Sequence, residues 1–332
     1  MTGDVLPKVP SVAPTLSVIV PTYRNGPYIY SNLLALDRVL SSIGEPYEIV
    51  VVSDGNDDNT HDEMRRLDAP HIHVYHYVRN MGKGFALRYG VTRSRGQVVT
   101  FIDGDGDIDP QQIPVYLRIM RESRADVVIG SKRHPDSNVI YPPLRWLYSA
   151  VYQALLRILF RLQVRDTQVG LKLFRREVLA AVLPRIVVKR YAFDLELLVV
   201  ASHLGFSRIV EAPVRIGQRL SSTINRQAIA SILIETAAIF YRKNVIRYYD
   251  RPHGFVTLDG LAIVADRELS EMVDERKIVH NVVRWLVAPV ERVLRNLAAL
   301  RTLAYRDCVA DVTDADQGVD DGEQEWRASG SR

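Results

Sequence analysis

The sequence predicts an α/β fold in which a mostly parallel sheet is flanked by helices. Short apolar runs rich in Val and Ile alternate with stretches of helical periodicity over residues 16–130, and parallel strands require helical crossovers of this kind. The nearly continuous apolar runs indicate strands that are covered on both faces. After residue 140 the helical period dominates, so amphipathic helices are expected in the C-terminal part.

Five strands and three helices are expected before residue 131. The strands are predicted at 16–20, 48–52, 71–77, 98–102 and 126–130, and the helices at 28–43, 83–94 and 111–123. Ligands of such sheets bind beyond the carboxyl ends of the strands. Functional side chains are therefore expected in the segments that follow the strands, which are PTYRN, SDGNDDNT, RNMGKG, DGDGDID and SKRH.

Composition excludes several classes of protein. The 332 residues are 47% hydrophobic and 25% charged, which excludes collagen-like, low-complexity and wholly disordered chains. The single cysteine, Cys308, excludes a disulfide framework and a cysteine-based zinc site, and favours a reducing compartment. The most apolar stretch, 228–240, is too short to span a bilayer. Residues 1–15 do not have the pattern of a secretory signal and are predicted to form a flexible leader.

The formal net charge of +4 is unevenly distributed. Residues 131–190 hold twelve Lys and Arg against three acids, whereas 311–325 hold seven acids and neither Lys nor Arg. The acidic stretch predicts a disordered tail over 307–332. Segments 142–163 and 275–306 are basic and amphipathic. Such segments are typical either of helices that lie on a membrane surface or of ordinary helices that cover a core or an oligomer interface.

Four aspartates follow the fourth predicted strand at alternate positions. They are Asp103, Asp105, Asp107 and Asp109. Their carboxylates would repel one another in a loop without a counter-charge, so a hard divalent cation is the expected partner, and a solvated acidic turn is the alternative. Mg²⁺ or Mn²⁺ held by two or three protein oxygens completes its shell with water and substrate phosphates. The pattern therefore also predicts a phosphorylated substrate.

Two other turns are candidates for contacts to that substrate. Asn80, Gly82, Lys83 and Gly84 lie where a strand passes into a helix, and such a turn favours an anion, although neither a Walker loop nor a dinucleotide fingerprint is present. Asp54 follows the second predicted strand. Its carboxylate is placed either to accept hydrogen bonds from a base or ribose or to cap a local turn.

Together these motifs resemble those of the inverting family 2 glycosyltransferases of GT-A fold, and specifically the polyprenyl-phosphate hexose synthases, the branch of the dolichyl-phosphate β-glucosyltransferases and dolichol-phosphate mannosyltransferases. The resemblance covers about 16–225 and rests on PTYRN, SDGNDDNT, NMGKGFALRYG, DGDGDIDP, GSKRH, RDTQVGLKLFRREV and RYAFDLELL, in the family's order. It implies a GT-A catalytic domain at 16–225 and a helical C-terminal appendage at 226–306. It also implies transfer of a hexose from a nucleotide-diphospho-sugar to a polyprenyl phosphate.

The resemblance also implies roles for individual residues. The nucleotide pocket and donor side would comprise Pro21, Thr22, Tyr23, Asp54, Asn80, Gly82, Lys83 and Asp103. The metal ligands would be Asp103, Asp105 and Asp107, with Asp105 also catalytic. The acceptor phosphate would be held by Lys132, Arg145, Ser149 and Arg219, with Arg215 as the alternative to Arg219. Asn25 replaces the family's pocket glutamate and Ser53 the first of two aspartates, so the donor base stays open between uracil and guanine.

The implied reaction does not require a strong general base. A lipid phosphate is mostly ionised near neutral pH, because its second pKa is about 6, so it can attack the sugar once a metal stabilises the leaving diphosphate. Asp166 and Asp194 would orient a substrate hydroxyl or a cation, or form ion pairs with neighbouring arginines. One alternative is an enzyme of the same fold with a soluble, protein or glycan hydroxyl acceptor, which needs a carboxylate base. Another is a catalytically silent metal-binding protein of the membrane surface.

The expected location is peripheral, at the cytoplasmic face of a membrane. The basic block 131–190 would be attracted to an anionic leaflet, at about 1 kcal/mol for each Lys or Arg near the surface. The helical segment 275–306 could instead form a homo-oligomer. No nucleic-acid partner is expected, because the basic surface lacks a recognised nucleic-acid-binding motif.

Overall fold

The computed structural model describes residues 13–55, 58–67, 69–137, 143–188, 191–217 and 226–251. These residues belong to the first of two compact units, Met1–Asp274, and the second unit is Glu275–Arg332. The predicted tail at 307–332, the predicted helix at 275–306 and almost all of the predicted leader lie outside the described residues. None of the helices that the structure describes has the length and hydrophobicity that a bilayer span requires.

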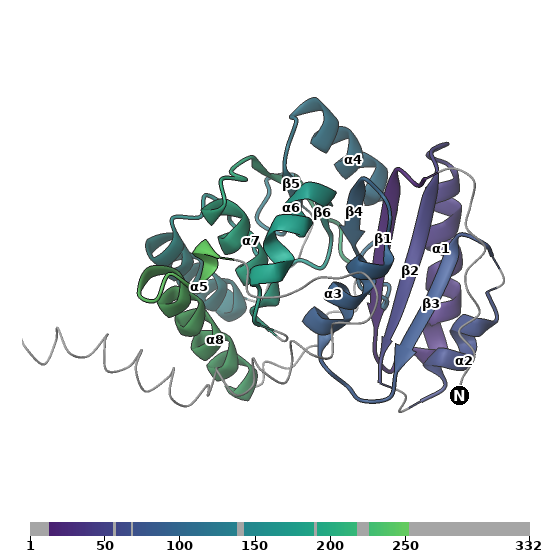
Figure 1. Cartoon of the computed structure of the whole chain (residues 1–332), viewed down its shortest axis with the longest axis horizontal. Helices are drawn as coiled ribbons and strands as arrows, with labels where there is room; N and C mark the ends of the chain where they lie inside the picture. Colours follow the sequence, from purple (N-terminus) through teal and green to yellow (C-terminus); the bar gives the residue numbers. More distant parts are fainter. Residues whose placement is uncertain are drawn as a thin grey trace, which may run out of the picture. The chain divides into compact units, whose positions relative to one another are not determined.

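A seven-stranded sheet in the order β3-β2-β1-β4-β6-β5-β7 forms the middle layer (Figure 1). The strands are β1 Leu16–Thr22, β2 Tyr47–Asp54, β3 Ile72–Tyr77, β4 Val98–Phe101, β5 Val127–Ser131, β6 Lys172–Arg175 and β7 Ile209–Pro213. Every pairing is parallel except the two made by β6, which runs antiparallel to both β4 and β5. The predicted mostly parallel sheet is confirmed, and the five predicted strands correspond to β1 to β5.

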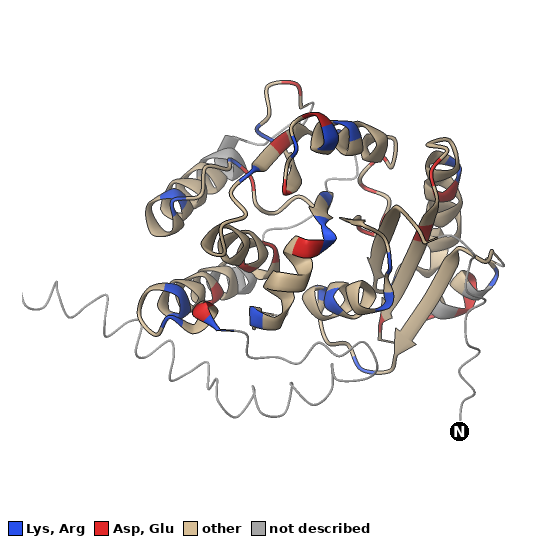
Figure 2. Cartoon of the chain, turned by 45° about the horizontal axis from the view of Figure 1, so that its top comes forward, with Lys and Arg blue, Asp and Glu red and all other residues tan. Residues whose placement is uncertain are grey.

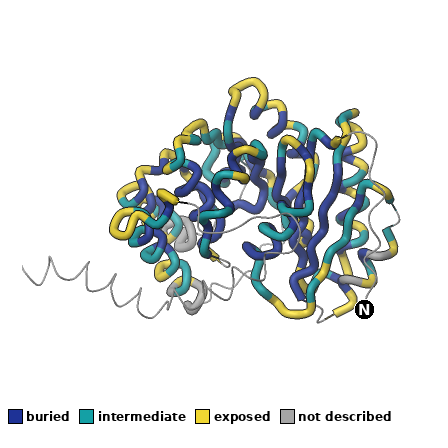
Figure 3. Tube along the Cα trace, viewed as in Figure 1, coloured by how far each residue is buried: buried dark blue, intermediate teal, exposed yellow. Residues whose placement is uncertain are grey.

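Two hydrophobic clusters, one on each face of the sheet, show which helices cover which face. The helices are α1 Gly26–Ser41, α2 Thr60–Arg65, α3 Lys83–Arg93, α4 Gln112–Glu122, α5 Pro143–Phe160, α6 Arg176–Val182, α7 Phe193–His203 and α8 Arg226–Asn244, with short 3-10 helices η1 Leu183–Arg185 and η2 Tyr248–Asp250. Helices α1, α2 and α4 pack on one face, with Val18 and Val20 of β1. Helices α3 and α5 to α8 pack on the other, with Ile19. Successive β1 residues therefore enter opposite layers, and the middle strands are buried (Figure 3).

Helix α8 is joined to α7 by a buried charged cluster. Glu196 of α7 is fully buried, and its Oε1 accepts hydrogen bonds from Arg242 of α8 at 3.1 Å and from the hydroxyl of Tyr249. Ile239 of α8 is also part of the core. Helix α8, the first part of the predicted appendage at 226–306, thus supplies the buried partner that Glu196 requires.

Candidate active site

The carboxyl ends of the strands bring the predicted functional segments to one edge of the sheet. Strand β1 ends at Thr22 and β2 at Asp54, while β4 leads to Asp103 and β5 to Lys132. Because β6 runs antiparallel, the segment that precedes it, residues 166–170, lies at the same edge. The segments after β1, β2, β4 and β5 and the RDTQVG motif thus lie at the same edge of the sheet, although they are far apart in the chain.

The aspartate loop is held in shape by β1 and α1. The backbone N–H of Gly104 donates to the carbonyl of Pro21 at 3.2 Å, and the side-chain amide of Asn32 on α1 donates to the carbonyl of Gly104 at 3.0 Å. Gly106 has a φ of +76°, and a Cβ there would lie 2.7 Å from the Asn32 amide nitrogen. The loop therefore requires glycine at 106 to pass Asn32.

Asp103 has a protein counter-charge in Lys83. The Nζ of Lys83 lies 2.6 Å from Asp103 Oδ1. Burial opposes the charge on Lys83, but the carboxylates of Asp103, Asp194 and Asp105 raise its pKa above the ordinary value, so this lysine stays protonated. On the other side of Asp103, a Cβ at Gly170 would lie 2.2 Å from Oδ2. Glycine at 170 therefore makes room for the Asp103 carboxylate.

Asp105 and Asp107 make the loop strongly acidic. The backbone N–H of Asp107 donates to Asp105 Oδ1 at 3.0 Å. Burial, and the charges of Asp103 and Asp107, raise the pKa of Asp105. Within the described part of the chain, no three His, Cys, Asp or Glu side chains are grouped so that they could hold a metal, so the predicted three-carboxylate set is not assembled here. Two neighbouring carboxylates, Asp103 and Asp105, still fit a hard divalent cation that takes its other ligands from water and phosphate.

Asp54 shapes the turn that begins α3. Its Oδ1 accepts the backbone N–H of Met81 at 2.6 Å, and its Oδ2 accepts that of Gly82 at 2.9 Å. The side-chain amide of Asn80 donates to the carbonyl of Asp54 at 3.3 Å. Of the two roles considered for Asp54, the structure shows the local one, in which its carboxylate caps the turn before α3. This turn places Lys83, the first residue of α3, beside the aspartate loop. Contact of Asp54 with a base stays a prediction.

Several polar groups at this edge lack a partner within the described structure. The hydroxyls of Thr22 and Thr167 and the amide nitrogen of Gln168 are buried and make no hydrogen bond there. Buried groups of this kind are rare in proteins and indicate a ligand or an ordered water. The ring of Tyr23 is 40% exposed beside them, with the Arg24 guanidinium 5.1 Å from its centroid. Thr167 and Gln168 were not predicted as site residues, although the RDTQVG motif that contains them was noted. Only the folded structure shows that their side-chain polar atoms are buried without a hydrogen-bond partner.

Asp166 positions the turn after β5. Its Oδ2 accepts the backbone N–H of Lys132 at 3.2 Å, and its Oδ1 accepts that of Gln168 at 3.0 Å. The neighbouring Arg165 lies nearest to Glu211, at 3.9 Å. Of the two alternatives for Asp166, the ion pair with an arginine is not formed by any residue that the structure describes, and backbone contacts instead join the SK turn to the RDTQVG motif.

Asp194 pairs with a lysine that the sequence did not single out. Lys172 of β6 is fully buried, and its Nζ donates to Asp194 Oδ1 at 2.9 Å and to the carbonyl of Val169. The sequence left two alternatives for Asp194, a contact with a substrate hydroxyl or a cation and an ion pair with an arginine, and the structure shows an ion pair with a lysine. Lys172 could have been found only from its position in a strand that is buried on both faces, where a charge requires a partner.

The acceptor-side residues are placed in part. Ser149 lies on α5, one turn after Arg145, and is half-buried. The side chain of Arg145 and all of Arg219 lie outside what the structure describes. The alternative residue, Arg215, is fixed by Gln112 of α4, which accepts its backbone N–H at 2.6 Å and donates to its carbonyl at 2.9 Å. The N–H of Gly217 donates to the carbonyl of Asp107 at 2.8 Å, so the chain reaches the aspartate loop two residues after Arg215.

Comparison with known proteins identifies the family. Residues 17–183 match the family model described as glycosyl transferase family 2. This chain belongs to glycosyl transferase family 2. It is 30% identical over 251 residues to the dolichyl-phosphate beta-glucosyltransferase ALG5C of Trichomonas vaginalis, which covers 70% of this chain and 73% of that protein. It is also 30% identical over 203 residues to the glycosyltransferase AglD of Haloferax volcanii, but this covers 60% of this chain and only 32% of that relative.

A solved structure confirms the predicted GT-A fold of this family 2 glycosyltransferase. Glucosyl-3-phosphoglycerate synthase from Mycobacterium tuberculosis, solved with Mn²⁺, UDP and glucosyl-3-phosphoglycerate, superposes with a TM-score of 0.51 at 19% identity, covering 69% of this chain and 80% of that one. The predicted family, fold and enzyme class are thereby confirmed. At this identity the likeness concerns the fold and does not extend to the substrate.

Proposed function

We propose that this glycosyltransferase moves a hexose from a UDP- or GDP-sugar to a polyprenyl phosphate. The observation that carries the proposal is that the carboxylates of Asp166 and Asp194, near the aspartate loop, already have partners within the protein. Asp166 is engaged with backbone N–H groups and Asp194 with Lys172. Both oxygens of Asp166 are thereby occupied, and Asp194, which keeps only Oδ2 open within the described structure, is charge-paired with the buried Lys172, so neither is placed as a free general base. A hydroxyl acceptor needs such a base, whereas an ionised phosphate does not. The names of the dolichyl-phosphate relatives point the same way.

Mg²⁺ or Mn²⁺ is proposed as the cofactor, held by Asp103 and Asp105 together with the donor diphosphate. When bound, the ion would supply positive charge to the leaving diphosphate. Asp54 and Gly82 keep Lys83 at the start of α3, on the donor side of the site, where its ammonium group lies beside the aspartate loop and pairs with Asp103. Tyr23 and the buried, unpartnered hydroxyl of Thr22 are proposed to contact the nucleoside, since both lie where β1 ends at the carboxyl edge of the sheet.

The acceptor phosphate is proposed to bind between the turn after β5 and helix α5. Lys132, Arg145 and Arg219 would supply positive charge, and Ser149 a hydroxyl donor. Asp166 would keep the backbone of Lys132 in place through its hydrogen bond. Since one phosphate oxygen attacks the sugar directly, the task of these residues is to hold and orient the anion.

We further propose that α5 and α8 dock on the cytoplasmic face of a membrane. The helices pack together through the Tyr152 and Thr236 hydroxyls at 2.9 Å, and their outer faces expose large apolar side chains. These are Tyr148, Val151 and Ile158 on α5, and Ile229, Leu233 and Ile234 on α8. Arg157 in the last turn of α5 is exposed and Lys243 in the last turn of α8 is half-buried, so both add positive charge at the helix ends, whereas Arg242 is buried against Glu196 (Figure 2). An apolar surface with a basic rim is complementary to an anionic bilayer.

Label transfer to lipid tests the proposal directly. The purified chain is incubated with radiolabelled UDP-glucose or GDP-mannose, Mn²⁺ or Mg²⁺, and either undecaprenyl phosphate or 3-phosphoglycerate, and the product is extracted into organic solvent. Label in the organic phase only when the lipid phosphate is present supports the proposal. Label confined to the aqueous phase with phosphoglycerate would establish the soluble-acceptor alternative. Absence of turnover with every pair would favour a silent binding protein.

A further inference from the structure

Two ion pairs lie on either side of the short segment Val169–Gly170. The carbonyl of Val169 accepts a hydrogen bond from Lys172, whose Nζ is 2.9 Å from Asp194 Oδ1. The next residue, Gly170, packs against Asp103, whose other oxygen is 2.6 Å from Lys83 Nζ. The register of the sheet agrees, because Lys172 is paired with Phe101, two residues before Asp103. The Lys83 and Asp103 pair and the Lys172 and Asp194 pair are therefore neighbours.

The two pairs differ in how firmly they are fixed. Lys172 is enclosed, with its side chain 1% exposed, and it has two acceptors. Lys83 is 37% exposed and reaches Asp103 from the first residue of α3. Asp194 uses only Oδ1 for Lys172, and its Oδ2 accepts no hydrogen bond from any residue that the structure describes. Lys172 is thus held in place by its two acceptors, whereas the more exposed Lys83 has room to move toward Asp194 Oδ2.

A divalent cation that binds Asp103 must compete with Lys83 for this carboxylate. The ammonium group already occupies Asp103 Oδ1. A displaced Lys83 would need another anionic partner, since stranding a half-buried charge is costly. Asp194 meets this need, because it belongs to the neighbouring pair and keeps one oxygen open.

We propose that in the metal-free enzyme the Lys83 ammonium group acts as a placeholder, which means that it occupies the position on Asp103 that a divalent cation takes. When the metal binds, Lys83 leaves Asp103 and forms an ion pair with Asp194. Asp194 is then a positioning residue, which acts on the metal site through Lys83. Lys172 holds Asp194 in place for this exchange, and Gly170 leaves room for Asp103 to change partners. The exchange makes and breaks ion pairs only. The inference rests on the proposed function only in assigning a divalent cation to Asp103 and Asp105.

Direct Mn²⁺ binding to the free protein tests the placeholder. The signal of free Mn²⁺ in electron paramagnetic resonance is titrated without nucleotide or acceptor. Lys83→Met should bind Mn²⁺ on the order of tenfold more tightly than the wild type, because the competing ion pair is gone. Arg93→Met is the matched control, since it removes the same charge from the last turn of the same helix. It should change the affinity less than twofold. Unchanged or weaker binding by Lys83→Met would overturn the inference.

A double-mutant cycle tests the role of Asp194. Asp194→Asn keeps an oxygen for Lys172 and should weaken Mn²⁺ binding several-fold when Lys83 is present. In the Lys83→Met background the same substitution should have little effect. An equal loss in both backgrounds would show that Asp194 acts only by its charge and would refute the exchange. If Asp194→Asn does not fold by circular dichroism, Lys83→Met and Lys83→Gln still decide the placeholder. Failure of lipid transfer would leave these binding results unaffected, so the two proposals fail separately.

Discussion

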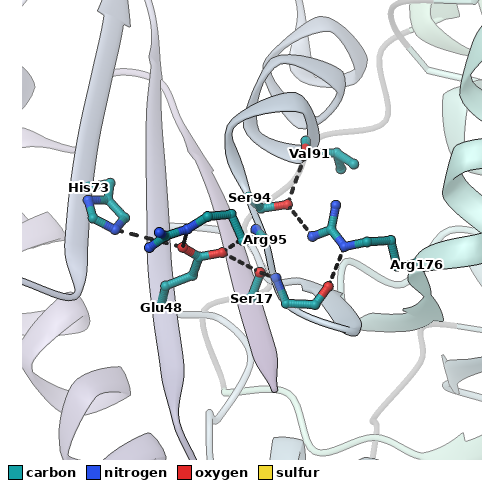
Figure 4. Close-up of polar contacts among 8 residues, drawn as sticks. Ser17, Glu48, His73, Val91, Ser94, Arg95 and Arg176 are labelled. Atoms are coloured by element: carbon teal, nitrogen blue, oxygen red, sulfur yellow. Dashed lines mark hydrogen bonds and ion pairs between the residues drawn. The ribbon is translucent and has the colours of Figure 1, made fainter. Parts of the chain in front are cut away.

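The Ser17 hydroxyl donates a buried hydrogen bond of 2.6 Å to Glu48 Oε1, across the β1 and β2 pair at the end of the sheet opposite the active site (Figure 4). Ser17 Oγ also accepts the backbone N–H of Gly96 at 2.6 Å, and Glu48 Oε1 accepts that of Arg95. These contacts tie the segment between α3 and β4 to the first two strands. Glu48 is therefore a structural carboxylate, distinct from those of the catalytic edge.

Removing the Ser17 hydroxyl should destabilise the fold without affecting catalysis. Ser17→Ala leaves the N–H of Gly96 and one oxygen of Glu48 without this partner in the core, at a cost of about 1–3 kcal/mol in the free energy of unfolding. Urea denaturation measures the loss. Ser41→Ala is the control, because its hydroxyl bonds to Tyr47 at the exposed surface and its removal should cost less than about 0.5 kcal/mol. Equal effects of the two substitutions would contradict the structural role of Ser17.

The histidine beside Glu48 predicts a loss of stability in mild acid. His73 Nε2 lies 3.7 Å from Glu48 Oε2, and burial lowers the pKa of His73, helped by the charges of Arg95 and His71 and opposed by Glu48. The unfolded chain then takes up a proton near pH 6.5, before the folded chain does. The free energy of unfolding should therefore fall as the pH drops below about 6.5, and level off below the lowered pKa.

Substitution of His73 separates this effect from other titrations. Thermal unfolding of wild type and His73→Gln between pH 8 and pH 5 should give a smaller acid-induced loss for the variant. His76→Gln, at an exposed position of the same strand, is the control and should follow the wild type. If the curves of wild type and His73→Gln run parallel, protonation of His73 does not contribute.

Local sequence patterns account for what was predicted correctly. Strands β1 to β5 are Val- and Ile-rich, and motifs placed after strands must meet at one edge of a parallel sheet. Strand β6 was not predicted, because its four residues include Lys172, whose burial depends on Asp194 far along the chain. The pairing of Lys83 with Asp103 was missed for the same reason, since it is set by tertiary geometry and no local periodicity reports it. For Asp54 the sequence left turn capping and base contact open, and only the fold shows the capping contacts.

Asp105 should be required for turnover and dispensable for folding. Its carboxylate is raised in pKa by burial and by its acidic neighbours Asp103 and Asp107, so Asp105→Ala relieves repulsion. Initial rates of sugar transfer should fall by about 10²-fold to 10³-fold or more, the range seen when a group that stabilises transition-state charge is removed. Asp109→Ala removes a carboxylate from the other end of the same motif, where Asp109 accepts the backbone N–H of Gln111, and should retain most of the rate. Full activity of Asp105→Ala in the presence of EDTA would refute the metal mechanism.

Arg145 should serve the acceptor more than the donor. The two substrates are both anions, but the family resemblance assigns Arg145 and Ser149, one turn apart on α5, to the lipid phosphate. Arg145→Ala is expected to raise the KM for polyprenyl phosphate on the order of tenfold, with a smaller change for the sugar nucleotide. Arg157→Ala, at an exposed position of the same helix, controls for the loss of one positive charge. Equal increases of both KM values would show that Arg145 serves the donor or the fold instead.

The outer faces of α5 and α8 should bind anionic vesicles in a salt-dependent way. Ile158 and Val151 of α5 are 78% and 62% exposed, and Leu233 of α8 is also exposed. Transfer of one such side chain from water to a bilayer contributes roughly 1.5–3 kcal/mol, so Val151→Glu with Ile158→Glu should reduce sedimentation with phosphatidylserine vesicles at least tenfold. The matched control is Val115→Glu, an exposed valine on α4 at the opposite face of the sheet. Molar salt, where the Debye length is about 3 Å, should weaken but not abolish binding of the wild type. Wild-type protein that stays in the supernatant at low salt would disprove membrane docking and favour a soluble acceptor.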